Sequence, residues 1–485
     1  MTVYNHIIHR INLDIEAPPG TDGHRLQDRV LHILYDQILP EIGKELDELD
    51  LAGRHIRIGE LNLDLGDMGD AGLEEELPLK MRQQLFMRIK AFSGRTEDTL
   101  LKTPESRLPS LSGPIPREQD DTVHAESLTP ERQMLDILIH YLKTGQLPWY
   151  CDGSSMAPAG QAVTGALYKL DAGDRDRLKN LLSFDSKALS RLILQYDSPV
   201  AGEVLTLLLA PSAGMKMDTL KKGVAKLTKK AALAATPEVY LHKIGQLLKS
   251  PRFSEAALEV REKEMPSGLD TQPLHHRLAG EGDKLKKKPD LLQENTGTRE
   301  KLERHADHPE PVRGDELPEE GLLVTHAGLI LLHPFLEYFF REFGLLEGDR
   351  FRDGKSRLTA AQMLGYLATG EDNLYEYDLL FEKYLCGISR DTPVLRKSLL
   401  TAEMKTESGN LLKAVIRHWK ELKNTSPDGL RQGFLIRRGK LVTGSFGHRL
   451  LVEKATQDTL LSWLPWGIGV IKLPWLSEIM HVEWN

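Results

Sequence analysis

Apolar and polar positions follow two different periods in the first 50 residues. From residue 7 to residue 15, apart from Ile8, every second position carries an apolar side chain or, at residue 9, a histidine. This alternation predicts a half-buried strand. Between residues 24 and 49 they recur every three or four positions, which predicts an amphipathic helix that Pro40 kinks or splits.

A second alternating stretch changes phase by one residue. Ile56 and Ile58 share one face, and the apolar set resumes one position out of phase over residues 61–65. A slip of one residue turns a strand inside out, so the pattern predicts a β-bulge near Gly59 and Glu60. Residues 5–66 then form a strand-helix-strand unit, and a short helix over residues 85–92 follows it.

A strongly punctuated helix follows a stretch rich in Pro, Ser and Gly. Thr129 is a typical N-cap, Pro130 suits the first helical position, and Gly145 is a typical stop. The string over residues 128–146 resembles a later one over residues 358–371, which also ends in Tyr-Leu-x-Thr-Gly. Internal duplication and convergence on the same helix signals both explain the match.

The rest of the chain separates by composition. Residues 161–248 are helical in pattern, whereas residues 260–320 are dominated by charge and predict a disordered or loosely helical linker. Apolar periodicity returns at Leu322. Near the end, Ser426 predicts a helix start, and residues 434–437 and 450–452 read as strands.

These patterns predict a predominantly helical α+β protein. The expected parts are a strand-helix-strand domain (1–92), a Pro/Ser-rich linker (93–127), a helical region (128–259), a charged linker (260–320) and a mixed α/β domain (321–485).

Composition narrows the class of protein. The chain has 485 residues, with 40% hydrophobic and 28% charged, which is typical of soluble globular proteins. Its net charge of −8 makes nucleic acid a poor partner. The two cysteines, Cys151 and Cys386, favour a reducing, cytoplasmic compartment. We expect neither a secretory signal at the first residues nor a membrane span.

Tryptophan is concentrated at the C-terminal end. Four of the six tryptophans lie there, and another follows a Leu-Pro pair near the middle helix. Large rigid side chains of this kind mark a core or a docking surface. The candidate interaction or core residues are therefore Trp149, Trp463, Trp466, Trp475 and Trp484.

No motif indicates catalysis, a metal ion or a cofactor. The acidic, glycine-containing stretch at residues 64–70 lacks the ligand spacing of an EF-hand and predicts a surface turn. His333, Asp378, Cys386 and His418 could converge in a fold, but their apolar neighbours favour helices that line a core. We expect a non-enzymatic interaction protein without cofactors.

Several strings together resemble the tape measure proteins of contractile injection systems, the phage-tail-like particles of bacteria. They are IHRINLDI (8–15), GRHIRI (53–58), LNLDLG (61–66), TGQLPW (144–149), AGLILLHPF (327–335), YLATG (366–370), KNTSPDGLR (423–431) and LPWG (464–467) followed by Glu483-Trp484. The resemblance implies a structural part of the inner tube that sets its length, with ends that contact the tube and the baseplate or tip proteins. Assembly in the cytoplasm, with a place inside the tube, is expected, and a homo-oligomer is an open alternative.

The middle of the chain limits how it could act as a ruler. One helix over residues 150–320 would reach roughly 255 Å. Eleven prolines between residues 158 and 318 exclude that helix, and no heptad seam supports a coiled coil. Two hypotheses follow: a length ruler or scaffold, and an assembly chaperone or adaptor that binds particle subunits without measuring length.

Overall fold

The chain divides into two compact units, which are described separately. The N-terminal unit comprises Met1–Met134 and Trp149–Met156, and the main unit comprises Leu135–Pro148 and Ala157–Asn485. Within them the computed structural model describes residues 8, 10–48, 55–58, 61–69, 72–98, 125–148, 150–151, 157–209, 214–233, 237–259, 317–318, 321–444 and 447–484.

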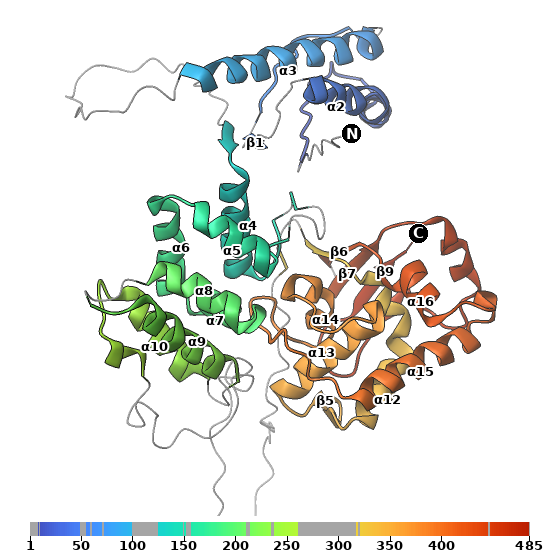
Figure 1. The fold of residues 1–485 in the computed structure, drawn as a ribbon. Helices are drawn as coiled ribbons and strands as arrows, with labels where there is room; N and C mark the ends of the chain where they lie inside the picture. Colours follow the sequence, from blue (N-terminus) through green and yellow to red (C-terminus); the bar gives the residue numbers. More distant parts are fainter. Residues whose placement is uncertain are drawn as a thin grey trace, which may run out of the picture. The chain divides into compact units, whose positions relative to one another are not determined.

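The N-terminal unit is built on a bent helix and a long one (Figure 1). Its elements are α1 (Gly23–Ile33), the π-helical η1 (Leu34–Ile38), α2 (Leu39–Glu48), β1 (His55–Ile58), α3 (Leu73–Asp98) and β2 (Ala125–Leu128), with β1 antiparallel to β2. The buried apolar side chains between the helices are Val30, Ile33, Leu34, Ile38, Ile42, Leu73, Leu77, Met81 and Leu85.

The predicted helix over residues 24–49 and its interruption near Pro40 are confirmed. Asp22 caps α1 by accepting a hydrogen bond from the backbone N–H of Arg25. The π-helical turn Leu34–Ile38 comes directly before the turn that contains Pro40. Because proline lacks an N–H and its ring crowds the carbonyl four residues earlier, the helix widens there instead of continuing regularly.

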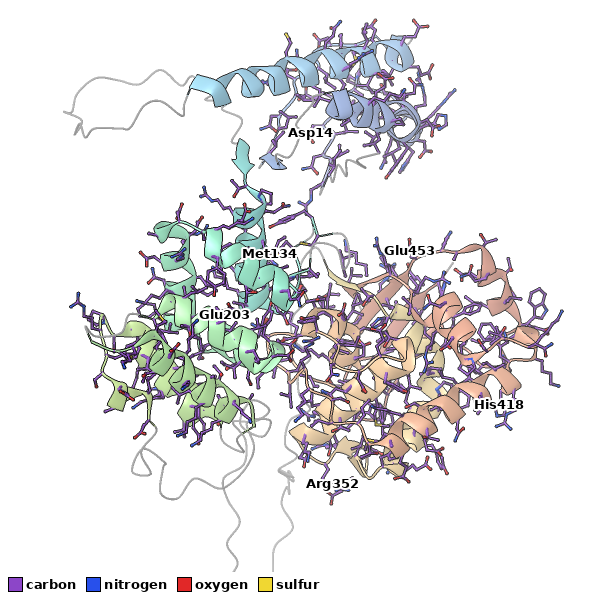
Figure 2. The ribbon with its side chains drawn as sticks, in the orientation of Figure 1. Asp14, Met134, Glu203, Arg352, His418 and Glu453 are labelled. Atoms are coloured by element: carbon purple, nitrogen blue, oxygen red, sulfur yellow. The ribbon has the colours of Figure 1, made fainter. Side chains whose placement is uncertain are left out.

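Two strand predictions in this unit are wrong. Residues 10–15 and 61–65 are extended, but neither segment joins a strand among the described residues. Ile11 and Leu13 instead lie half-buried against the helices, while Asp14 is exposed (Figure 2). Alternating apolar residues show that one side of a segment is buried. That side can pack against helices as well as in a sheet.

Other predictions in this unit have mixed outcomes. The short helix expected over residues 85–92 is part of the 26-residue α3, which begins at Leu73. The acidic stretch has no regular structure over residues 64–69, where Gly66 donates its N–H to Asp64 Oδ1. The bulge at residues 59–60 lies outside the described residues.

The first part of the main unit is a bundle of short helices. They are α4 (Pro130–Thr144), which starts in the N-terminal unit, α5 (Gly160–Lys169), α6 (Ala172–Phe184), α7 (Ser186–Gln195), α8 (Ser198–Leu208), α9 (Met217–Leu233), α10 (Pro237–Lys249) and the 3-10 helix η5 (Glu255–Leu258). Asp171 and Asp185 cap α6 and α7 by accepting backbone N–H groups. Leu178, Leu192, Val204 and Leu220 are among the fully buried side chains of this bundle.

The C-terminal region combines helices with a mixed sheet. In chain order it contains β3 (Leu322–Val324), η7 (Ala327–Leu332), α12 (His333–Glu342), β4 (Leu346–Glu347), β5 (Arg350–Phe351), α13 (Gly354–Thr369), η8 (Glu376–Asp378), α14 (Leu380–Leu385), α15 (Ala402–His418), η9 (Lys420–Leu422), α16 (Pro427–Leu430), η10 (Arg431–Leu435), β6 (Gly439–Gly444), β7 (Gly447–Val452), η11 (Thr456–Trp463), β8 (Val470–Ile471) and β9 (Met480–Glu483). The fold is predominantly helical α+β, as predicted.

The sheet has the strand order β3-β6-β7-β9-β8. β6 and β7 form an antiparallel hairpin, and β9 lies parallel to β7. The strand predicted over residues 450–452 is confirmed in β7, but residues 434–437 form no strand because the π-helical η10 occupies Arg431–Leu435. The helix start at Ser426 is confirmed, since its hydroxyl accepts the Gly429 N–H.

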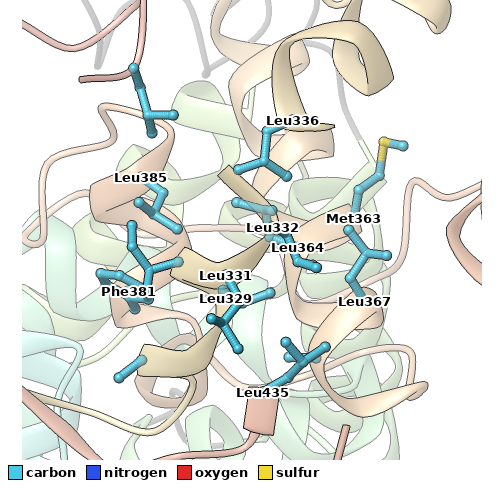
Figure 3. Packing of buried hydrophobic residues seen from close by; sticks show 14 of the residues in the cluster. Leu329, Leu331, Leu332, Leu336, Met363, Leu364, Leu367, Phe381, Leu385 and Leu435 are labelled. Carbon is cyan, nitrogen blue, oxygen red and sulfur yellow. The ribbon is translucent and has the colours of Figure 1, made fainter. Parts of the chain in front are cut away.

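One continuous apolar core supports this region. Leu329, Leu331 and Leu332 of η7 face residues of α13, α14 and η10, as Figure 3 shows for Leu364, Phe381 and Leu435 among others. A side chain at Gly328 would collide with the backbone carbonyl of Phe434. The core thus depends on a close approach of two backbones that only glycine permits.

Two helices of the main unit end alike. α4 and α13 stop at Gly145 and Gly370, with left-handed φ angles of 74° and 79°. In each, the preceding threonine hydroxyl donates to the carbonyl four residues earlier and accepts the N–H two residues later. An arginine from a later element binds carbonyls of each last turn: Arg191 at α4 and Arg431 at α13. Shared helix-end signals explain the threonine and glycine at both ends. They do not by themselves require an arginine that binds the carbonyls of each last turn.

Candidate functional site

Trp466 and Trp475 are anchored in the C-terminal core by their indole groups. Trp466 Nε1 donates to the carbonyl of Leu331 at 3.1 Å, and Trp475 Nε1 donates to the carbonyl of Leu385 at 2.7 Å. Both side chains are partly buried against the core. Because each indole N–H is already paired inside the protein, the two tryptophans hold the C-terminal segment onto η7 and α14.

Aromatic contacts strengthen this anchoring. The Trp475 ring lies 5.5 Å from Phe340 and 5.3 Å from Phe351, measured between ring centroids. Trp466 packs edge-on against Phe335 at 5.2 Å. Aromatic pairs at these separations contribute roughly 0.5–1.5 kcal/mol beyond their buried area.

The final tryptophan is part of the core and closes a small polar cluster. Trp484 is 8% exposed, and its Nε1 donates to Asp458 Oδ2 at 3.1 Å. The same carboxylate oxygen accepts from Arg437 Nη1 at 3.1 Å, and the Arg437 guanidinium lies 5.7 Å from the Trp484 ring centroid. Trp484 is therefore held by a hydrogen bond to a charged carboxylate and by a cation–π contact with Arg437.

Trp463 differs from these three residues. It ends η11 with 60% of its surface exposed, although η11 itself lies on the core surface through Leu460 and Leu461. Trp149 lies outside the described residues. Among the described C-terminal tryptophan side chains, Trp463 is the one that presents a large apolar group to solvent.

Sequence reasoning missed a fourth core tryptophan. Trp419 is fully buried, packs 4.9 Å from Phe434 between ring centroids, and donates its Nε1 to the Leu460 carbonyl at 3.3 Å. Trp419 continues the helical spacing of apolar residues in the preceding helix. That spacing predicts its burial, whereas a search for Leu-Pro-Trp does not find it.

A buried charge cluster joins the helical bundle to the C-terminal region within the main unit. Glu376 is 0% exposed and lies 2.7 Å from Lys383 Nζ and 3.3 Å from Arg191 Nε. Arg191 also donates to the carbonyls of Leu142, Lys143 and Asp391. One carboxylate and main-chain carbonyls thus compensate two buried cations.

The remaining donors of this cluster are also satisfied. Lys383 Nζ donates to the carbonyls of Arg390 at 2.6 Å and Thr392 at 2.8 Å. Burial lowers the pKa of Lys383, and the Glu376 carboxylate opposes that change. Gln195 accepts from Tyr141 Oη and from the Glu376 N–H, both at 2.8 Å. No spacing in the sequence connects Arg191, Glu376 and Lys383, so sequence reasoning did not identify them.

The four residues considered as a convergent group have different partners. Cys386 is fully buried, and burial raises the pKa of its thiol. His333 Nδ1 bonds the Ile330 carbonyl, and the His418 ring lies against Phe335. Burial raises the pKa of Asp378 to about 6, with the nearby His326 opposing the rise.

His326 pairs with Glu382 beside Asp378. Its Nδ1 lies 2.6 Å from Glu382 Oε1, and both side chains are buried. Burial alone would lower the pKa of His326, but the Glu382 carboxylate outweighs this effect and raises it. The group is a buried acid–base pair between the start of η7 and α14.

In the part of the chain that the structure describes, no three His, Cys, Asp or Glu side chains are grouped so that they could hold a metal ion. Among the described helices, none is long and apolar enough to cross a bilayer.

Comparison with known proteins gives one finding. The family model described as contractile injection system tape measure protein matches residues 5–484, nearly the whole chain. No curated protein and no solved structure matches this chain.

Proposed function

Because this chain belongs to the contractile injection system tape measure protein family, we propose that it sets or scaffolds the length of the particle's inner tube. The observation that carries the proposal is the family match, which includes both ends of the chain. A structural or assembly role in such a particle follows from the family. The contacts with tube and baseplate or tip proteins, assembly in the cytoplasm and the lack of catalysis are the finer parts of the proposal.

The compact middle helices restrict where a ruler could lie. Residues 157–259 fold into short helices around one core, so they do not extend as a rod. The connection between Glu259 and Leu317 remains, and its sequence is rich in charged residues and contains five prolines. Fully extended, such a connection spans at most roughly 200 Å.

A docking role for the C-terminal end is supported by Trp463. Three neighbouring tryptophans use their indole N–H groups inside the protein, whereas Trp463 is 60% exposed. Exposed tryptophan is enriched among the residues that dominate protein interfaces. We therefore assign to Trp463 the contact with a tube or baseplate subunit.

The ruler is tested by deletion. About 50 residues are removed in frame between residues 260 and 316 in cells that make the particle, and tube lengths are measured by electron microscopy. A ruler shortens the tubes by about 75 Å if this segment is helical, and by up to roughly 170 Å if it is extended. Tubes of unchanged length would overturn the ruler and leave an assembly chaperone or adaptor.

The docking role is tested with a matched pair of variants. Trp463→Ala is expected to keep the unfolding transition of the wild type but to lower incorporation into particles. Trp475→Ala removes a core anchor, so it is expected to destabilise the protein by about 3–5 kcal/mol. Normal incorporation of a folded Trp463→Ala protein would contradict the assignment.

A further inference from the structure

The extended segment at residues 10–16 belongs to no strand in the part of the chain that the structure describes. Among the described residues, no backbone hydrogen bond involves residues 10–17. Pro18 and Pro19 follow directly and end the stretch. An extended backbone of this kind offers a row of donors and acceptors on which another strand can pair.

The side chains of this segment already have two distinct faces. Ile11 and Leu13 lie half-buried against the helices, while Arg10, Asn12 and Asp14 are exposed. One face is therefore fixed by packing, and only the backbone edge remains for a partner. Ile15 belongs to the apolar set by its position, yet it is 48% exposed.

An open apolar groove lies between this segment and the first two helices. It has a volume of about 880 Å³ and is lined mainly by aliphatic side chains, among them Ile8 and Ile15 of the segment and Leu31 of α1. Ile8 and Leu31 are 47% and 39% exposed. The segment therefore combines a backbone edge that has no partner among the described residues with apolar side chains that are largely exposed.

The segment is complementary to itself when read in the opposite direction. An antiparallel pair of two identical copies centred on Leu13 places Arg10 opposite Glu16, Asn12 opposite Asp14 and Ile11 opposite Ile15. Opposite charges face each other at both ends, polar residues pair with polar ones, and apolar residues share the helix side.

The second extended segment lacks this property. Residues 61–65 repeat the apolar-Asn-apolar-Asp-apolar pattern, but the flanking residues are Glu60 and Gly66, which form no charge pair. Of these two segments, only residues 10–16 are self-complementary in charge.

We propose that two copies of this chain associate through antiparallel pairing of residues 10–16 about a two-fold axis at Leu13. The ladder pairs the backbone groups of both segments, and the second copy covers Ile15 and part of the groove. A two-stranded pair alone is marginally stable in water, so burial of this apolar surface supplies the additional stabilisation. A two-fold contact closes on itself, so, given the proposed role in the particle, the particle takes up an even number of copies.

Charge exchange tests the pairing in the full chain. The dimer dissociation constant is measured by sedimentation equilibrium at low salt for the wild type, Arg10→Glu, Glu16→Arg and the double variant. Each single substitution places like charges opposite each other at both ends and is expected to weaken dimerisation at least tenfold. The double variant restores opposite charges and is expected to return close to the wild-type value.

Glu75→Arg serves as the control for Glu16→Arg, because it makes the same charge change at an exposed position on α3. It is expected to leave the dissociation constant within about threefold. Arg10 and Glu16 are exposed, so the variants keep the wild-type circular dichroism spectrum. A monomeric wild type at all concentrations, or a double variant as weak as the single ones, would overturn the proposal.

The position of the axis has its own test. A residue on a two-fold axis meets its own copy, so Leu13→Cys is expected to form a disulfide between chains under mild oxidation. Asn12→Cys faces Asp14 of the other copy and is expected to cross-link far less. Equal cross-linking of both variants would exclude this register.

Discussion

The two units of this protein bury very different kinds of groups. The main unit holds two apolar clusters, and a carboxylate, a guanidinium and an ammonium group lie between them with at most 1% exposure. In the N-terminal unit, among the residues that the structure describes, nine apolar side chains are buried and no charged group is. The buried charge cluster of the main unit has internal partners, whereas residues 10–17 of the N-terminal unit form no backbone hydrogen bond with another described residue, and Ile15 is 48% exposed.

This difference assigns separate tasks to the two units. Each buried charge in the main unit has several fixed partners, so its interior tolerates little change. A small core without charged groups gives modest stability but leaves more surface for other molecules. We infer that the main unit preserves shape and the N-terminal unit is adapted to association.

The largest expected effect comes from removing the central carboxylate of the main unit. Glu376→Ala leaves Arg191 and Lys383 buried as like charges, so we expect a loss of about 3–5 kcal/mol in the free energy of unfolding. Urea unfolding followed by tryptophan fluorescence measures it, because five of the six tryptophans lie in the main unit.

Glu337→Ala is the matched control for this substitution. Glu337 pairs with Arg341 one turn away on α12, and both side chains are at least 40% exposed. Its removal is expected to cost about 0.5 kcal/mol or less. Equal losses for Glu376→Ala and Glu337→Ala would show that the buried cluster does not stabilise the main unit.

The two similar helix ends give the next contrast. In Gly145→Ala, the new methyl group would overlap the Glu376 carboxylate, in addition to the left-handed φ of 74°. We expect a loss of about 2 to 3 kcal/mol. Gly370→Ala meets only the Arg431 guanidinium at 3.2 Å, and we expect it to lose less. Urea unfolding measures the stability of both variants. A larger loss for Gly370→Ala than for Gly145→Ala would contradict the expected clash at Gly145.

A smaller effect depends on pH. The pKa of Asp378 is raised to about 6 by burial, against the pull of His326, while Glu382 and Glu371 add to the rise. The folded state therefore binds a proton more strongly than the unfolded state, so this group's contribution to stability falls as the pH rises from about 4 to about 6.

Asp378→Asn isolates that contribution. We expect the variant to be about 1–2 kcal/mol more stable than the wild type at pH 7, and the difference to shrink towards pH 4. Thermal or urea unfolding at a series of pH values measures both proteins. A difference that stays constant with pH would mean that Asp378 ionises normally in the folded state.

The smallest expected effect belongs to the N-terminal unit. Gly43 lies inside α2 on the wall of the groove, and an added methyl group there meets nothing within 4 Å. Gly43→Ala should stabilise this unit by about 0.5–1 kcal/mol by limiting the unfolded chain.

Amide hydrogen exchange in α2 measures the change locally. Gly165→Ala in α5, where the space is equally open, is the counterpart in the main unit. A gain at Gly165 with none at Gly43 would indicate that the groove is already filled in solution.

Local signals predicted the elements that depend on local chemistry. Thr129, Pro130 and Gly145 defined α4 correctly, because capping and left-handed stops act within a few residues. The bend near Pro40 was predictable for the same reason. Alternation failed at residues 10–15, since it reports which face is buried and not which element covers it.

The candidate site was predictable only in part. The C-terminal tryptophans stand out by composition, but their roles depend on where each indole N–H finds an acceptor, and Leu331 and Leu385 are remote in sequence. Arg191 and Glu376 are 185 positions apart. Nothing local marks such a pair as buried, because both residue types are usually exposed.

The contact between Gly145 and Glu376 also restricts how this sequence can change over time. Any side chain at position 145 would compete with the carboxylate for the same space, and loss of the carboxylate would leave two cations buried. Neither position can be substituted first without a penalty. In a lineage of such proteins, the two positions should therefore be exchanged together, with Arg191 and Lys383, or not at all.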